Sequence, residues 1–313
     1  MILSVSRRTD IPNYYSEWFI NRIKDGFLYV RNPMNIHQVS KITLSPDIVD
    51  CIVFWTKNPK AIINKLDELS EYKFYFQFTL TGYGIDIEKG VPHKKNEVIP
   101  IFKELSEKIG SKKVIWRYDP ILFNDIYTEE YHINAFSQIA EELKGYTHRC
   151  VISFVDYYAK NKTSMEELKL EEKSEKQLIN FSAKLQEIAS ANGIEVFSCA
   201  EKIDLSGCGI KHGSCIDKNT IEEIIGCKID VSKDKNQRGE CGCVESVEVG
   251  SYNTCLNGCK YCYANYSEKM VCNNVKKCDV NSPLLCGNIE DTDKITERKM
   301  KSLKIQQISM FDI

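Results

Sequence analysis

Residues 98–118, VIPIFKELSEKIGSKKVIWRY, contain one complete helix–strand unit and indicate how the chain folds. The second part of this stretch, Lys113–Tyr118, is short and largely apolar, as expected of a strand buried on both faces of a parallel sheet. The first part has apolar residues at three- and four-residue steps, the spacing of one helix face: Ile99, Ile101, Phe102, Leu105 and Ile109. We therefore predict a helix followed by a buried strand.

The same alternation extends over the first two thirds of the chain. The segment 173–193 repeats the helical pattern and ends at Gly193, a typical C-terminal cap. Repeated strand–helix units predict an α/β fold with a complete or partial parallel (β/α) barrel. An open doubly wound sheet is the alternative, although no Gly-rich phosphate turn follows any strand. Strand-like runs occur at Ile2–Ser6, Cys51–Trp55, Lys73–Leu80, Lys113–Tyr118, Arg149–Val155 and Glu195–Cys199.

The composition is that of a soluble globular protein with a sizeable core. Of the 313 residues, 42% are hydrophobic and 27% are charged. The net charge of −2 gives no basic field that would indicate nucleic acid or a membrane surface, although it excludes neither. No secretory signal follows Met1, and the most apolar runs are too short to span a bilayer. We expect a cytoplasmic protein with no membrane partner.

Polar side chains concentrate where the expected strands end. In (β/α) barrels, functional groups from several strand ends converge on one face of the barrel. Strand ends also meet water and are often polar for that reason alone, and Arg117 and Asp119 could form a structural ion pair. The candidate catalytic residues are Arg7, Arg8, Asp10, Lys57, Arg117, Asp119, Asp156 and Glu201.

The cysteines are concentrated in the last third of the chain, where eleven of the fourteen lie between Cys208 and Cys286. In a reducing compartment such crowding indicates metal binding rather than disulfides. Cys255, Cys259 and Cys262 have the spacing C-x3-C-x2-C, with the aromatic Tyr261 before the third cysteine. A compact loop of this kind can present three thiolates to a [4Fe–4S] cluster and leave its fourth iron open. Zinc with a fourth ligand from elsewhere is the alternative.

This motif resembles the signature of the radical S-adenosylmethionine superfamily, C-x3-C-x-aromatic-C. The resemblance implies that the open iron binds S-adenosylmethionine, that the reduced cluster cleaves it to a 5′-deoxyadenosyl radical, and that a partial (β/α) barrel holds the substrate. It also implies a reducing partner such as flavodoxin or ferredoxin. A non-catalytic metal-binding module and an electron-transfer protein are the competing functions.

The motif lies near the end of the chain, whereas the superfamily usually carries it after the first barrel strand. Circular permutation explains this difference, with a strand at 243–250 in the role of the first strand and Ile2–Ser6 in that of the second. The superfamily's Gly-Gly-Glu turn is absent, and its place falls to residues 7–10. Asp10 would then bind the ammonium group of S-adenosylmethionine and an arginine its carboxylate, while Tyr261 would also contact the cofactor.

The chain also resembles a bacterial family catalogued as domain of unknown function 1848. The resemblance covers most of the chain and rests on SRRTDIP near the start and on CGC followed by C-x3-C-x-Y-C-Y-A near the end. It implies no particular substrate.

Four further cysteines, Cys208, Cys215, Cys241 and Cys243, lie in Gly-rich surroundings before the motif. They predict a second site, for an iron–sulfur cluster or for zinc. The competing ligands are Cys227, Cys272, Cys278, Cys286 and His212. Free thiols buried as small apolar groups are the alternative.

These patterns divide the chain into four segments. Barrel units occupy 1–206, a Cys-rich segment with the possible second site 207–242, the last strand and the cluster loop 243–286, and a polar tail 287–313. The tail ends in QISMFDI, where Gln307, Ile308, Met310 and Phe311 resemble the motif that docks bacterial repair enzymes on the DNA sliding clamp. An anchor packed on the barrel is the alternative. The clamp motif, with a similarity to spore photoproduct lyases, links the expected activity to nucleic-acid repair or modification.

Overall fold

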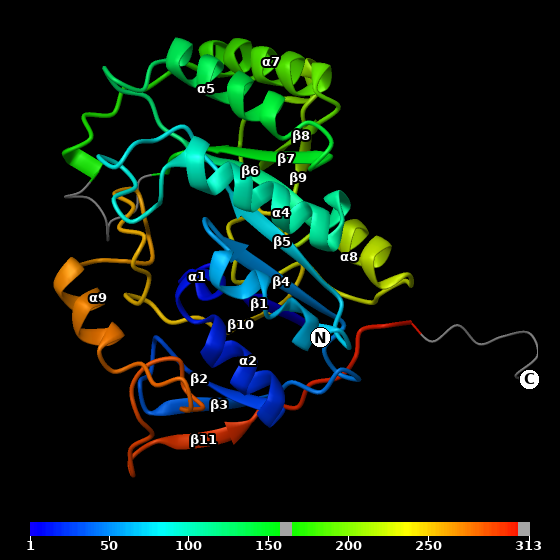
Figure 1. Ribbon diagram of the computed structural model, residues 1–313, viewed down its shortest axis with the longest axis vertical. Helices are drawn as coiled ribbons and strands as arrows, with labels where there is room; N and C mark the ends of the chain where they lie inside the picture. Colours follow the sequence, from blue (N-terminus) through cyan, green and yellow to red (C-terminus); the bar gives the residue numbers. More distant parts are fainter. Residues whose placement is uncertain (157–164, 306–313) are drawn as a thin grey trace, which may run out of the picture.

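The computed structural model describes residues 1–156 and 165–305 and shows an α/β fold around an eight-stranded, entirely parallel sheet (Figure 1). All six strands expected from the sequence are confirmed, and the strand expected at 243–250 is reduced to two residues. The strand order is β10-β1-β4-β5-β6-β7-β8-β9. The strands are β1 (Ile2–Val5), β4 (Cys51–Thr56), β5 (Phe74–Thr79), β6 (Val114–Ile121), β7 (Arg149–Phe154), β8 (Glu195–Cys199), β9 (Lys211–Gly213) and β10 (Val247–Glu248).

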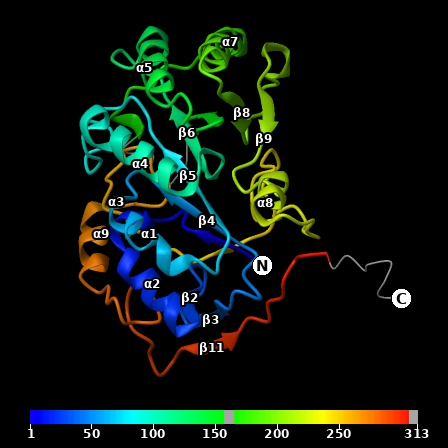
Figure 2. The same ribbon diagram turned by 45° about the vertical axis from the view of Figure 1, so that its right-hand side comes forward.

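Helices cover one face of this sheet, as the alternating pattern predicts. Trp18, Phe102, Phe136 and Phe181 project from four of them into a core shared with the strands, and α4, α5 and α7 run beside the strands in Figure 2. The expected helices at 98–110 and 173–193 are confirmed, and Gly193 has the left-handed φ of 71° expected after a helix end. The helices are α1 (Ile11–Tyr14), α2 (Ser16–Asp25), α3 (Lys60–Ile63), α4 (Ile99–Ile109), α5 (Glu129–Glu142), α7 (Glu175–Ala191), α8 (Lys218–Ile225) and α9 (Glu268–Val275).

The sheet is open, with β10 and β9 as its edge strands, and no pairing between them occurs among the described residues. A closed barrel is therefore not formed. The chain between these edges, residues 214–246, instead lies against the face of the sheet opposite the main helical layer. There Tyr75 and Gln77 of β5 both donate to the carbonyl oxygen of Cys215, at 2.9 and 2.6 Å. Apolar residues of this segment pack on the same face beside Ile2, Val53 and Val151.

A second sheet of three strands includes part of the segment 287–313, which the sequence suggested as a polar tail. It has the order β11-β3-β2, with β2 (Phe27–Arg31), β3 (Gln38–Thr43) and β11 (Lys294–Glu297). The polar tail thus contributes an edge strand, all of whose residues are exposed. The main sheet likewise continues past residue 206, because β9 pairs with β8.

The first strand of the chain lies beside the last strand of the main sheet. Leu3 and Ser4 of β1 pair in parallel with Val247 and Glu248 of β10. The strand β10 therefore stands before β1 in the spatial order of the sheet.

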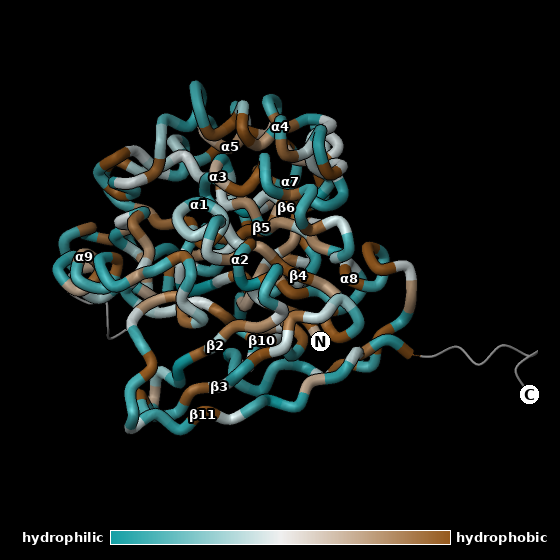
Figure 3. Tube along the Cα trace, turned by 60° about the horizontal axis from the view of Figure 1, so that its bottom comes forward, coloured by the Kyte–Doolittle hydropathy of each residue, from teal (hydrophilic) through white to brown (hydrophobic). Residues whose placement is uncertain are grey.

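Hydropathy follows this layering, with hydrophobic residues along the central strands and hydrophilic residues on the outer turns (Figure 3). Among the described residues, no helix is both long enough and apolar enough to cross a bilayer.

Candidate functional site

A cavity of about 950 Å³ lies at the carboxyl ends of the parallel strands. Its walls come from the ends of β1, β4, β5, β6, β7 and β8, from the segment between β9 and β10, and from the loop after β10. Parallel sheets place their ligand sites at this edge. Most of the residues predicted for the site line this cavity: Arg7, Arg8, Asp10, Lys57, Arg117, Asp119, Asp156 and Tyr261.

The three cysteines of the C-x3-C-x2-C motif, which we call the loop cysteines, line the cavity. Burial raises the pKa of Cys255 to about 12, and it also raises the pKa values of Cys259 and Cys262. These thiols hold their protons at neutral pH, so metal binding would have to displace the protons.

Asp10 holds the loop cysteines close to the first strand. Its carboxylate accepts from the backbone N–H of Asn13 at 3.1 Å, which caps α1, and from that of Lys57 at 2.8 Å. It also accepts from the side chain of Asn257, inside the motif, at 3.1 Å. Burial raises the pKa of Asp10, and these hydrogen bonds oppose the rise. Since both oxygens already accept hydrogen bonds from the protein, Asp10 is a positioning residue for the loop.

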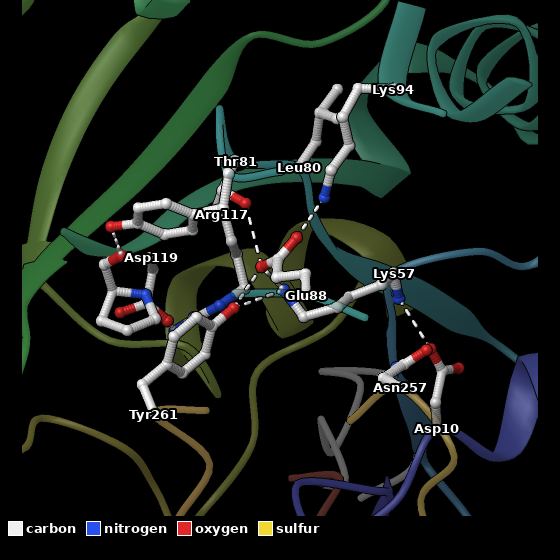
Figure 4. Close-up of polar contacts among 12 residues, drawn as sticks. Asp10, Lys57, Leu80, Thr81, Glu88, Lys94, Arg117, Asp119, Asn257 and Tyr261 are labelled. Carbon is white, nitrogen blue, oxygen red and sulfur yellow. Dashed lines mark hydrogen bonds and ion pairs between the residues drawn. The ribbon is translucent and has the colours of Figure 1, made fainter. Parts of the chain in front are cut away.

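A second buried carboxylate, Glu88, holds the other side of the loop (Figure 4). It accepts from Lys57 at 2.7 Å and from Thr81 at 2.9 Å, and Lys94 and Tyr261 donate to it as well. Burial alone would disfavour its charge, but the two lysines lower its pKa to about 2. Lys57 also donates to the Tyr261 hydroxyl at 2.9 Å. This network fixes Tyr261 between two loop cysteines.

Backbone contacts hold the same loop. The N–H of Gly90 donates to the Asn257 carbonyl at 2.9 Å, and that of Lys260 to the Ile87 carbonyl at 3.0 Å. A Cβ at position 90 would collide with the carbonyl oxygen of Leu256, so this close approach requires glycine.

The cavity lining also carries arginines and carboxylates in pairs. Arg117 forms the ion pair with Asp119 that the sequence suggested, and Ser153 donates to the same carboxylate. Arg238 pairs with Asp156. Much of the charge predicted here is thus engaged within the protein.

Glu201 is the one predicted catalytic residue that is not part of the cavity lining. It accepts from the backbone N–H of Phe154 at 2.8 Å. Burial raises its pKa to about 7, although that hydrogen bond opposes the rise. Glu201 therefore contacts the end of β7 and is not part of the cavity wall.

A second group of buried thiols, which we call the inner cysteines, also lines the cavity: Cys199, Cys215, Cys241 and Cys243. The sulfurs of Cys199 and Cys215 are 3.0 Å apart. The Cys243 thiol interacts with those of Cys215 and Cys241, so the four sulfurs form a chain of neighbours. This group contains three of the four ligands expected for a second metal site.

Cys208, the fourth expected ligand, does not belong to this group. Its thiol donates to the Leu205 carbonyl at 3.0 Å, and it packs against the core under the helices. Cys199, at the end of β8, takes its place. The sequence reasoning missed Cys199 because it lies in an apolar strand; its position at a strand end was the available signal.

The other suggested ligands lie apart from the cavity lining. His212 contacts the carbonyl of Glu240 at 2.7 Å, and Cys272 is exposed on α9. Cys278 and Cys286 both donate to the carbonyl of Asn274. Cys227 follows α8 and is half-buried. None of these five joins the inner cysteines in the described structure.

Three buried polar atoms of the cavity have no hydrogen-bond partner within the described ranges: Arg7 Nη2, Thr9 Oγ1 and Asn265 Oδ1. Asn265 lies three residues after Cys262, and its amide nitrogen donates to the Cys255 carbonyl at 2.7 Å. Buried atoms of this kind normally have a partner, so they suit a polar ligand beside the loop cysteines.

No three His, Cys, Asp or Glu side chains in residues 1–156 and 165–305 converge as a preformed metal centre. The loop cysteines nevertheless fit a three-thiolate metal site in donor type and number, and they face a cavity with room for a ligand. Metal binding would require side-chain rotations of the thiols.

Glu88, Lys94 and Asn265 are site residues that the sequence reasoning missed. Glu88 lies in an irregular stretch after β5, and Lys94 begins a short π-helix, Lys94–Val98, so no periodic pattern marks either residue. The expected clamp-binding residues Gln307, Ile308, Met310 and Phe311 lie outside the described residues.

No curated protein matches this chain. The family model described as Domain of unknown function (DUF1848) matches residues 2–264, which include the whole main sheet and the loop cysteines. The chain belongs to this family.

Proposed function

We propose that the protein is a radical S-adenosylmethionine enzyme whose [4Fe–4S] cluster is held by Cys255, Cys259 and Cys262. The observation that carries this proposal is that all three loop cysteines open into one large cavity at the carboxyl ends of eight parallel strands. A closed structural site would need a fourth protein ligand, whereas three ligands leave one metal position for a small molecule.

The strand order supports the permuted arrangement expected from the sequence. Because β10 pairs with β1, the motif follows a strand that stands first in the spatial order of the sheet. We interpret the open parallel sheet as the partial (β/α) barrel of a circularly permuted member of the superfamily.

The residues around the loop have distinct roles in this proposal. The cluster, when bound, supplies the electron that cleaves the carbon–sulfur bond of S-adenosylmethionine. Asn265 Oδ1, buried and without a described partner, would accept from the ammonium group of S-adenosylmethionine. Arg8, whose described contacts are the Gly250 carbonyl and the Tyr252 ring, would pair with the carboxylate. Asp10 and Glu88 would position the loop.

The size and charge of the cavity bear on the substrate. A volume of about 950 Å³ is at the upper end of ligand sites and leaves room for a second molecule beside S-adenosylmethionine. Arg298 lines it without a carboxylate partner in the described parts of the chain, in addition to Arg8, which would pair with S-adenosylmethionine. We propose a substrate with negatively charged groups, in line with a role in nucleic-acid repair or modification.

Anaerobic reconstitution with iron and sulfide tests the proposal. We expect about four irons and four sulfides at the loop site, an electron paramagnetic resonance signal of the reduced cluster that changes when S-adenosylmethionine is added, and release of 5′-deoxyadenosine. A flavodoxin or ferredoxin would serve as the physiological reductant, and dithionite can replace it in the assay.

The matched variants are Cys255→Ala/Cys259→Ala/Cys262→Ala and, as control, Cys272→Ala, which removes an exposed cysteine from α9. The triple variant should lose the cluster and all cleavage, and the control should retain both. A cluster that reduces but never cleaves S-adenosylmethionine would overturn the proposal in favour of electron transfer. Zinc as the sole metal after anaerobic purification would leave a non-catalytic metal-binding module.

A further inference from the structure

The inner cysteines form a compact group from distant parts of the chain. Cys199 ends β8, Cys215 follows β9, and Cys241 and Cys243 precede β10. The sulfurs of Cys199 and Cys215 are 3.0 Å apart, and Cys243 interacts with both Cys215 and Cys241. All four are buried. Four thiols assembled from four chain positions are not needed to fill an apolar core, which a valine or an alanine would fill equally well.

The surrounding backbone holds these cysteines in place. The carbonyl of Cys215 accepts from both Tyr75 and Gln77 of β5. The N–H of Ile216 points at the Cys243 sulfur at 3.4 Å, and the N–H of Val244 bonds to the Ile216 carbonyl at 3.1 Å. N–H groups directed at sulfur are typical of thiolate ligands in metal sites.

Gly242 allows the chain around it to approach the end of β9. A Cβ at this position would lie 3.3 Å from both the Gly213 carbonyl oxygen and the Ser214 Cβ, closer than side chains normally pack. The glycine between Cys241 and Cys243 therefore lets both sulfurs reach the same place as Cys215.

Two arginines provide positive charge beside the group. Arg117 donates to the Cys215 sulfur, and Arg7 interacts electrostatically with Cys243 and Cys215. Both guanidinium groups lie over the Trp55 ring, 5.3 Å and 5.1 Å from its centroid for Arg7 and Arg117. Arg7 Nη2 is buried and has no hydrogen-bond partner in the described part of the chain. Four thiolates around a divalent ion carry a net charge of −2, and the two arginines lower its electrostatic cost, although Arg117 is also paired with Asp119 and Arg7 with Asp234.

We propose that Cys199, Cys215, Cys241 and Cys243 bind a zinc ion as a closed, four-thiolate site that is separate from the loop cysteines. Zinc is bound tetrahedrally at Zn–S distances of about 2.3 Å, which places neighbouring sulfurs about 3.8 Å apart. The spacing of 3.0 Å between the Cys199 and Cys215 sulfurs would widen by less than one ångström to match this value, and the Cys241 and Cys243 sulfurs would complete the tetrahedron. A cubane cluster has an iron atom behind each thiolate and would require much larger separations.

This site would join the two open edges of the main sheet. Cys199 belongs to the β8–β9 side, and Cys241 and Cys243 lead directly into β10. A zinc ion here would connect both edges on the face of the sheet opposite the main helical layer, in place of the strand pairing that closes a barrel. The inference does not depend on radical chemistry at the loop cysteines.

Zinc analysis of the full chain after aerobic purification tests the proposal, because zinc has no redox chemistry and survives conditions that destroy an open iron–sulfur cluster. We expect about one zinc per chain. Cys199→Ala and Cys243→Ala should each retain roughly tenfold less zinc than the wild type after dialysis against a chelator. The matched control is Cys208→Ala, which should retain zinc at the wild-type level.

Equal zinc in all variants would overturn the proposal. A protein without zinc in which two of the fourteen cysteines fail to react with a thiol reagent would also overturn it, because this result would indicate a Cys199–Cys215 disulfide. Iron and sulfide bound by these four cysteines would overturn the assignment to zinc. If the single variants do not fold, Co²⁺ can be titrated into the Cys255→Ala/Cys259→Ala/Cys262→Ala variant, which lacks the other site. The absorption of tetrahedral cobalt bound by four thiolates supports the proposal, and its absence overturns it.

Discussion

The loop cysteines and the inner cysteines line the same cavity, but they are assembled differently. The loop cysteines fall within eight consecutive residues, and their geometry depends on a short segment held by Asp10 and Glu88. The inner cysteines span residues 199–243 and meet because β8, β9 and β10 belong to one sheet. Both groups line the cavity, but the first offers three thiols and the second four. This difference suggests an open metal position for an exchangeable ligand at the loop cysteines and a structural ion at the inner cysteines.

The largest effect that would test this comparison is expected at Glu88. Replacing Glu88 with glutamine leaves Lys57 and Lys94 buried without their counter-ion, which should lower the free energy of unfolding by about 3–5 kcal/mol. The pKa of about 2 lies below that of an ordinary glutamate, so the ion pairs contribute above about pH 4.5 and are lost as the pH falls towards 2. Urea unfolding at several pH values measures both effects.

The control is Glu107→Gln on the exposed side of α4, which should stay within about 0.5 kcal/mol of the wild type. We also expect Glu88→Gln to release iron from the loop while zinc at the inner cysteines is retained. Equal unfolding curves for the two variants would contradict the role of Glu88 as an anchor of the loop.

A smaller effect is expected at Asp10. In Asp10→Asn one carboxylate oxygen becomes an NH2 donor. If this group faces Asn13, one buried hydrogen bond is lost, and if it faces Lys57 and Asn257, two are lost. We expect a loss of about 1–3 kcal/mol in the free energy of unfolding and slower cluster reconstitution. The control is the exposed Asp47→Asn. Unchanged reconstitution in Asp10→Asn would show that the loop keeps its geometry without this carboxylate.

The smallest effect concerns the region beside the inner cysteines. The pKa of Glu201 is raised to about 7, so its protonated form is favoured in the folded protein. The free energy of unfolding is therefore unaffected by this group below about pH 4.5. It falls as the pH rises through 7, by about 1–2 kcal/mol for a partly exposed group, because the folded protein disfavours the charged carboxylate. Glu201→Gln should remove this loss, and thermal unfolding between pH 4.5 and 8 measures it.

Glu187→Gln, on the exposed face of α7, is the matched control and should keep the pH dependence of the wild type. If Glu201→Gln also keeps the pH dependence of the wild type, burial of the Glu201 carboxyl group does not affect stability in this pH range.

The sequence by itself determined the elements whose signals are local. Buried parallel strands are continuous apolar runs, and for this reason all six expected strands were recognised, as was the helix–strand unit at 98–118. The loop cysteines were recognised because the spacing of a compact loop is written in consecutive residues. The Arg117–Asp119 pair was accessible for the same reason, since two residues separated by one position in a strand project to the same side.

The tertiary structure decided whatever depends on residues distant in the sequence. The open sheet could not be distinguished from a barrel because closure depends on whether the edge strands meet, and here residues 214–246 lie between them. The role of Glu88 could not be predicted because its partners Lys57, Lys94 and Tyr261 come from three separate segments. Cys199 was not predicted for a related reason. It lies in an apolar strand, and it becomes a site residue only because β8 ends beside Cys215 in the folded protein.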